Sequence, residues 1–262
     1  MCIKKNILFF IAIIFVCGCK KVLDVNLNAS EPQIVITGEV NNMPGPYKVS
    51  ISKSVNFGEN NDFPPVSGAL VTIKDKRITD TLSEDGPGKY FTKRIKGKPG
   101  ESYTLQVELE GKAYIATSVM PMPVELDSIS FLLGRKNTIY PVANFQDPPD
   151  IHNYYQFIEY IDGASLRNGR GNSVFDDRLS DGRYITSVIY NDSSVIKTGA
   201  TLTVQMNCID ENVYNYLGEL LQITGGGGFG SPAPANPESN ISGGVLGYFT
   251  ANFVSSRTVT IQ

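Results

Sequence analysis

The stretch SYTLQVELE, residues 102–110, decides the fold class of this protein. Its apolar side chains, Tyr103, Leu105, Val107 and Leu109, alternate with the polar side chains of Thr104, Gln106, Glu108 and Glu110. Successive side chains of a β-strand point to opposite faces of a sheet, so a period of two gives one apolar face and one polar face. The stretch therefore predicts a strand that is buried on one face only.

Similar strands are predicted on both sides of this stretch throughout the first half of the chain. They cover residues 33–40, 47–51, 69–74, 90–95 and 113–119. Turn-forming glycines and prolines, such as Pro44-Gly45-Pro46 and Gly86-Pro87-Gly88, separate them. Short strands at this spacing are typical of a β-sandwich.

The second half of the chain is also predicted to be β-rich, with a single helix. Strands are expected at residues 126–133, 139–145, 154–161, 184–190 and 200–208, followed by two closing strands near 247–254 and 258–262. Asp210 can cap a helix in which Val213, Leu217, Leu220 and Leu221 recur at helical spacing, and Gly225 can stop it. The helix is expected near residues 211–223, and the glycine- and proline-rich residues 225–237 are expected to form a loop.

The boundary between the halves is placed at Met120-Pro121-Met122-Pro123, because proline lacks a backbone donor and interrupts sheet pairing. The predicted fold class is all-β, with two immunoglobulin-like or transthyretin-like β-sandwich domains in tandem. Residues 33–122 form the first domain in this interpretation, and residues 123–262 form the second, which contains the helix. A length of 262 residues suits two domains of ordinary size.

The N-terminus has the pattern of a lipoprotein leader. Lys4 and Lys5 precede an apolar run, residues 7–16, which is too short to span a bilayer. Val16-Cys17-Gly18-Cys19 follows, with small residues before a cysteine that can carry a diacylglyceryl thioether. We expect residues 1–18 to be removed, Cys19 to be lipidated and residues 19–32 to form a tether. Two or more acyl chains are enough for stable anchoring.

Charge and cysteine content exclude several classes of protein. Residues 1–18 contain two of the 23 lysines and arginines and none of the 26 acidic residues, so the mature chain would carry a formal charge of −5. An acidic chain without basic runs is not expected to bind nucleic acid. Once Cys2 and Cys17 are removed and Cys19 is lipidated, only Cys208 remains. We expect Cys208 to be a buried core residue, because it continues the alternation of its strand.

His152 is the one histidine in the sequence, so a catalytic triad or a zinc site would depend on it. It lies in Asp150-Ile151-His152-Asn153, shortly after the turn at Asp147-Pro148-Pro149. One hypothesis is that the protein is a hydrolase that uses Asp150 and His152. The favoured interpretation is that His152 is a solvated loop residue. The chain is therefore not expected to be an enzyme, and no cofactor is expected besides the covalent lipid.

Asp176, Asp177 and Asp181 form the best candidate for a metal site, because calcium prefers clustered carboxylate oxygens. The spacing departs from an EF-hand loop, since counting twelve positions from Asp177 reaches Val188 where that motif needs glutamate. Aspartates that only bond their own turn are the competing interpretation, and it is the favoured one.

Several stretches resemble one family of proteins and occur in the same order as in that family. They are FPPVSGA (63–69), GPGKY (86–90), residues 97–107, NYY (153–155) and NPESNISGGVLGYF (236–249). The chain thus resembles a Bacteroidota lipoprotein family of unknown function, DUF4249, over nearly its whole mature length. PVSGALV (65–71) and Tyr103-Thr104-Leu105 also resemble carboxypeptidase-regulatory and transthyretin-like sandwiches.

The resemblance implies an envelope lipoprotein associated with TonB-dependent outer-membrane receptors, without established catalytic residues. Within its closing motif, Asn240, Gly243, Gly244, Tyr248 and Phe249 are a candidate interaction loop, because loops on rigid sandwiches often carry binding. The competing interpretation is structural, since glycines permit positive φ and close approach beside a strand.

Three functional hypotheses follow. The leading one is a lipid-anchored, non-catalytic binding or accessory module of the outer membrane that serves a TonB-dependent receptor. The second is a structural or adhesive envelope lipoprotein, and the third is the hydrolase based on Asp150 and His152. The sequence leaves open the ligand, the oligomeric state and whether the domains face the cell surface or the periplasm.

Overall fold

The computed structural model describes residues 31–55, 62–135, 138–166, 172–190, 196–224 and 236–261. The predicted leader, Cys19, nearly all of the tether, the Gly225 stop and most of the 225–237 loop lie outside these residues. Within them the chain is mostly β with one α-helix, as predicted, and residues Pro32–Gln262 form one compact unit. The tandem sandwich arrangement stays a prediction. No helix in these ranges is both long and apolar enough to cross a bilayer.

The largest sheet has nine strands, in the order β12-β11-β15-β16-β1-β2-β6-β5, with β13 also paired to β11. Its members are β1 (Ile34–Asn41), β2 (Lys48–Lys53), β5 (Ser83–Glu84), β6 (Lys89–Phe91), β11 (Tyr154–Ile161), β12 (Ala164–Ser165), β13 (Asn172–Asp176), β15 (Thr201–Ile209) and β16 (Leu246–Thr260). This sheet therefore contains strands from both halves of the chain.

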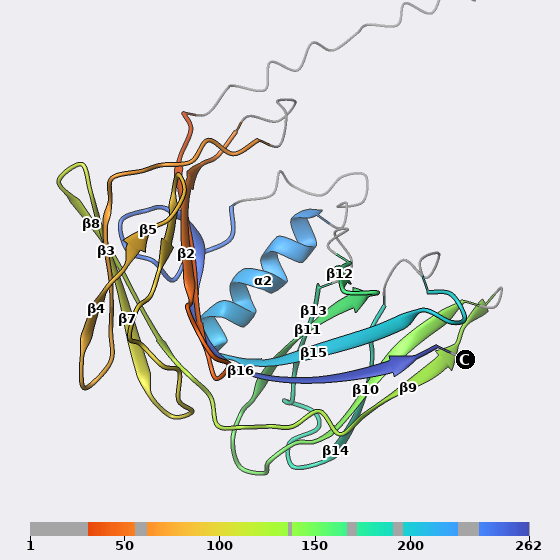
Figure 1. Cartoon of the computed structure of the whole chain (residues 1–262). Coiled ribbons are helices and arrows are strands. Elements are labelled where there is room, and N and C mark those ends of the chain that lie inside the picture. The colour runs from red at the N-terminus through yellow and green to blue at the C-terminus, as the bar shows by residue number, and fades with distance from the viewer. Residues whose placement is uncertain are drawn as a thin grey trace, which may run out of the picture. The chain divides into compact units, whose positions relative to one another are not determined.

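One long strand, β16, joins the two groups of strands in this sheet (Figure 1). Its first part, residues 246–252, runs parallel to β1, and its second part, residues 253–260, runs antiparallel to β15. Gly247 is required at the start, because a Cβ there would lie 2.0 Å from the carbonyl oxygen of Ile36. The predicted boundary near residue 122 stays a prediction, and β16 pairs with strands on both sides of it.

The prediction of two closing strands, near residues 247–254 and 258–262, is wrong. Ser255 and Ser256, between the expected strands, stay in the ladder opposite Met206 and Gln205 of β15. Ser255 is buried, and its hydroxyl accepts a hydrogen bond from the N–H of Leu126 at 3.0 Å, so its polar group has a hydrogen-bond partner. The polar pair therefore does not end the strand.

Two smaller sheets complete the β-structure of the described residues (Figure 1). One has the order β4-β3-β7-β8, formed by β4 (Thr79–Thr81), β3 (Leu70–Lys74), β7 (Ser102–Leu109) and β8 (Lys112–Val119). The other has the order β14-β10-β9, formed by β14 (Tyr184–Val188), β10 (Ile139–Gln146) and β9 (Ser128–Leu133). The alternation predicted for residues 102–110 is confirmed in β7, whose apolar side chains are all buried.

The predicted helix is confirmed as α2 (Glu211–Thr224). Asp210 caps it, since its Oδ1 accepts a hydrogen bond from the N–H of Val213 at 3.0 Å. Val213 and Leu217 are buried against Ile209, and the helix packs on strands β11, β13 and β16 (Figure 1). Strand β15, which leads into the helix, carries Cys208, whose burial is also confirmed and raises the pKa of its thiol to about 12.

Candidate functional site

Three aspartates meet where the three-stranded sheet adjoins the nine-stranded sheet. Asp147 directly follows β10, Asp177 directly follows β13, and Asp181 lies in the turn between β13 and β14. One ligand oxygen from each carboxylate can be chosen so that all three lie within 4.8 Å of one another. We call these three residues the aspartate cluster.

Backbone hydrogen bonds of the 177–183 turn bring the cluster together. The N–H of Ser180 donates to the carbonyl of Asp177 at 2.6 Å, and the N–H of Arg183 donates to the carbonyl of Ser180 at 3.0 Å. The N–H of Asp147 then donates to the carbonyl of Arg183 at 3.0 Å, which ties the end of β10 to this turn. Gly182 has a φ of +69°, a conformation that glycine adopts without strain.

Asp147 is completely buried and accepts two hydrogen bonds. The hydroxyl of Tyr155 donates to its Oδ1, and the N–H of Gly182 donates to its Oδ2 at 2.9 Å. Burial raises the pKa of Asp147, the nearby charges of Asp177 and Asp181 raise it further, and these effects outweigh the two hydrogen bonds. Tyr155 keeps its proton, since burial and the contact with Asp147 both raise its pKa.

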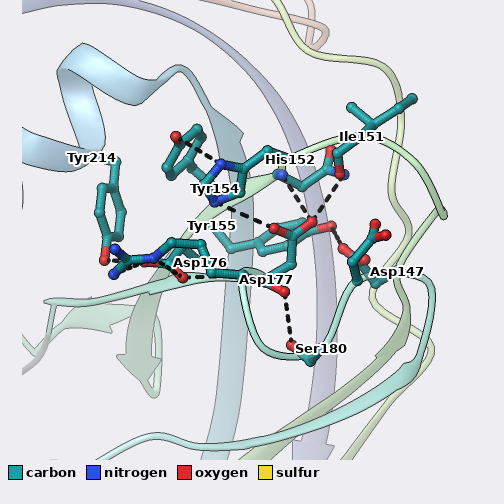
Figure 2. A network of polar contacts seen from close by, with 12 residues as sticks. Asp147, Ile151, His152, Tyr154, Tyr155, Asp176, Asp177, Ser180 and Tyr214 are labelled. Carbon is teal, nitrogen blue, oxygen red and sulfur yellow. Dashed lines mark hydrogen bonds and ion pairs between the residues drawn. The ribbon is translucent and has the colours of Figure 1, made fainter.

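Asp177 is 1% exposed, and its two carboxylate oxygens have different environments. Its Oδ2 accepts hydrogen bonds from the backbone N–H of Asn153 at 2.9 Å and from the Asn153 amide at 3.4 Å. Its Oδ1 is buried and accepts no hydrogen bond from any residue that the structure describes. Figure 2 shows this carboxylate between the His152 ring and Asp147.

His152 lies against Asp177, with 3.5 Å between its Nε2 and the Asp177 Oδ1. The imidazole is 43% exposed in its side chain and carries a positive charge only if it is protonated. Its Nδ1 lies 3.2 Å from the Tyr154 hydroxyl, and the two rings pack at 4.5 Å (Figure 2). The predicted loop position and exposure of His152 agree with the structure, but its contacts with Asp177 and Tyr154 were not foreseen.

Asp150, the other residue of the hydrolase hypothesis, contacts the cluster through its backbone. It has a φ of +65°, and its N–H donates to Asp181 Oδ2 at 3.3 Å. The carboxylate beside His152 is thus that of Asp177, and a His–Asp pair is present with a different aspartate from the one in the hypothesis.

Asp176, which the less favoured calcium hypothesis grouped with Asp177 and Asp181, does not belong to the cluster. It forms an ion pair with Arg178 at 2.8 Å and accepts a hydrogen bond from the Tyr214 hydroxyl, also at 2.8 Å. Burial opposes ionisation, but these contacts outweigh it and lower the pKa of Asp176. Asp147 takes its place in the cluster. The turn signal at Asp147-Pro148-Pro149 marked this residue in the sequence, without indicating its partners.

The structure accounts for the candidate interaction loop mostly in structural terms. The Asn240 side chain pairs with the backbone of Phe249, accepting at 2.9 Å and donating at 2.7 Å, and the Phe249 side chain is completely buried. Gly243 and Gly244 have φ values of +91° and +72°, as the structural interpretation requires. Tyr248 packs against Tyr216 with 5.0 Å between ring centroids. Binding of a receptor or ligand by this loop stays a prediction.

Fold and site together define a mostly β protein in which two buried aspartates and one exposed aspartate form a cluster where the three-stranded sheet adjoins the nine-stranded sheet. The chain belongs to the DUF4249 family, a domain of unknown function, whose family model matches residues 20–258. No curated protein matches the chain significantly.

Proposed function

We propose that this protein is a lipid-anchored, non-catalytic binding or accessory module of the outer membrane, serving a TonB-dependent receptor. The leader pattern ending at Cys19 supports the anchor. The resemblance of its motifs to an envelope lipoprotein family supports the class of partner. The binding role rests on one observation in the folded part, which is the exposed apolar edge of β9.

Strand β9 lies at the end of the three-stranded sheet and, among the described residues, pairs only with β10. Its last residues, Phe131, Leu132 and Leu133, are all exposed, and Leu133 is 72% exposed. Natural proteins usually protect an edge strand with charged residues, prolines or a covering segment. β9 contains serine, isoleucine, phenylalanine and leucine only.

An edge strand whose described residues include neither a charge nor a proline is suited to strand addition, in which a partner supplies the next strand and pockets for alternate side chains. Backbone groups of the edge give affinity in this mode, and the exposed apolar side chains give additional contact area. We propose that the receptor or one of its extended segments pairs with β9. Pairing of a receptor with β9 distinguishes the accessory role from a structural or adhesive role, which requires no receptor at this strand.

The anchor is tested by mass spectrometry of the mature chain and by membrane fractionation. We expect a lipidated N-terminal Cys19, and we expect Cys19→Ala to remove the chain from the membrane fraction. An unmodified Cys19, or a mature chain that starts elsewhere, would contradict the proposed anchor.

The partner is tested by purification of the tagged chain in a mild detergent. A TonB-dependent barrel should co-purify with the wild type and should be lost when Phe131 and Leu133 are both changed to Asp. Met122→Asp is the matched control, because Met122 is also exposed and lies outside β9. Absence of any outer-membrane barrel from the wild-type preparation would count against the receptor, and equal loss in both variants would count against the β9 edge.

A further inference from the structure

The aspartate cluster places three carboxylates close together, two of them almost completely buried. Like charges at such distances repel each other, and burial increases the repulsion because water no longer screens it. The single positively ionisable side chain that contacts the cluster through an ion pair in the described structure is His152, which lies on the exposed side. A bound cation would relieve this repulsion between the carboxylates.

A second observation points to a bound ion at the same place. Asp177 Oδ1 is buried and has no hydrogen-bond donor among the residues that the structure describes, although almost all buried polar atoms in proteins have one. Its distance of 3.5 Å from His152 Nε2 is beyond that of an ordinary hydrogen bond. A buried carboxylate oxygen without a hydrogen bond, in a group of three carboxylates, is suited to a metal ion.

We propose that Asp147, Asp177 and Asp181 bind a calcium ion. The ligand oxygens lie within 4.8 Å of one another, and oxygens on opposite sides of Ca²⁺ are about 4.6–5.2 Å apart. Within the described residues, the ligand group consists of carboxylates without imidazole or thiol, which favours a hard cation over zinc. Calcium also accepts backbone carbonyl and water oxygens in a flexible sphere, whereas Mg²⁺ demands a small octahedral one.

The ion would connect elements of two sheets. Asp147 follows β10 and Asp181 precedes β14, both in the three-stranded sheet, whereas Asp177 follows β13 of the nine-stranded sheet. Asp177 also holds the backbone of Asn153 at the start of β11. Calcium bound here would fix these connections relative to one another and stabilise the turn at residues 177–183.

The proposal is tested on the mature chain, purified in detergent and stripped with a chelator, with Tb³⁺ as a luminescent probe for calcium. The chain has no tryptophan, so tyrosine must sensitise Tb³⁺, and the hydroxyl of Tyr155 donates to Asp147 directly. We expect tyrosine-excited Tb³⁺ emission that Ca²⁺ displaces, together with a rise in Tm on adding Ca²⁺.

Two matched variants locate the ion. Asp181→Asn removes a proposed ligand from an exposed position, where the fold tolerates the change, and should weaken Ca²⁺ binding at least about tenfold. Asp176→Asn removes the same charge from the neighbouring Arg178 pair and should leave Ca²⁺ binding unchanged. Thermal melts in chelator establish that both variants are folded.

Three results would overturn the proposal. They are a wild type without Ca²⁺-displaceable Tb³⁺ emission, equal affinities in Asp181→Asn and Asp176→Asn, and displacement by Zn²⁺ but not by Ca²⁺. The last result would assign the ion to a site that includes His152. Because the assay requires no receptor, its outcome is independent of the proposed accessory role.

Discussion

Asp75 and Asp80, in the region of the four-stranded sheet, are buried almost as completely as Asp147 and Asp177 beside the three-stranded sheet. Their electrostatic environments differ. Asp80 Oδ2 accepts hydrogen bonds from the backbone N–H groups of Lys93, Arg94 and Ile95 at 2.8, 2.7 and 3.0 Å. Burial alone would raise the pKa of Asp80, but these donors outweigh burial and lower it.

The negative charge of Asp75 is stabilised in the same way. Its carboxylate accepts hydrogen bonds from the backbone N–H groups of Arg77 and Ile78 and pairs with the Arg77 guanidinium. Its pKa is lowered, again against the effect of burial. In the aspartate cluster, by contrast, burial raises the pKa of Asp147, and the other two carboxylates raise it further. Burial of an aspartate therefore does not by itself indicate a binding site, whereas burial without enough hydrogen-bond donors does.

The largest effect is expected from breaking the balanced side of this comparison. Asp80→Ala leaves three backbone N–H groups, one buried and two partly buried, without their acceptor, which should lower the free energy of unfolding by about 3–5 kcal/mol. Urea unfolding at pH 7 measures this loss. Asp85→Ala, at an exposed position directly after β5, is the control and should change stability by less than about 0.5 kcal/mol. Similar losses of stability in both variants would refute the role of Asp80 as the acceptor of these three N–H groups.

A smaller, pH-dependent effect follows from the lowered pKa of Asp80. A carboxyl with a lower pKa in the folded state stabilises the fold above its unfolded pKa, about 3.9, and this contribution is lost as the pH falls through the folded value. Asp80→Asn lacks this titration, so its stability should approach that of the wild type as the pH falls below about 4. Urea midpoints at several pH values test this, and a constant difference would contradict it.

Gly182 allows the geometry of the aspartate cluster to be altered without changing its charge. A Cβ at Gly182 would lie 2.9 Å from Pro149 Cβ, in a backbone of positive φ, whereas a Cβ at Gly163, also of positive φ, meets no atom within 4 Å. Gly182→Ala should cost about 1–3 kcal/mol and Gly163→Ala about 1 kcal/mol or less. Thermal unfolding measures the difference, and Tb³⁺ binding should weaken only in Gly182→Ala. If both variants have equal effects on stability and on Tb³⁺ binding, the contact between residue 182 and Pro149 does not affect the cluster.

The sequence predicted the elements whose side chains carry a clear period. β7 has one buried face and α2 has a capping aspartate and helical spacing, so both were found. β4, β5 and β12 have two or three residues each, too few for a period to appear. The parallel pairing of β16 with β1 joins the two ends of the described chain, and no local pattern encodes such a partner.

The site was predicted in part, for a related reason. Asp177 and Asp181 were found because they are close in sequence, whereas Asp147 comes from another segment that only the tertiary fold brings near. Asp176 was included because it is adjacent to Asp177, yet neighbouring residues of an extended chain point to opposite sides. Asp176 therefore faces Arg178 and Tyr214, and Asp177 faces the cluster.

The smallest predicted effect is a change in the sign of a stability difference. In the presence of a chelator, Asp181→Asn removes a like charge from the cluster and should raise the free energy of unfolding slightly, by less than about 1 kcal/mol. With saturating Ca²⁺ the order should reverse, because the wild type then gains more binding free energy than the variant.

Asp176→Asn provides the opposite case, since it breaks the contacts with Arg178 and Tyr214 and should lower stability in both conditions. Chemical unfolding of the three proteins with and without Ca²⁺ measures these signs. If Asp181→Asn destabilises the chelated protein, the Asp181 carboxylate stabilises the fold without a metal ion, and the contrast with Asp80 loses its electrostatic basis. If the order reverses with Ca²⁺, uncompensated charge is the property that separates the cluster from the structural aspartates.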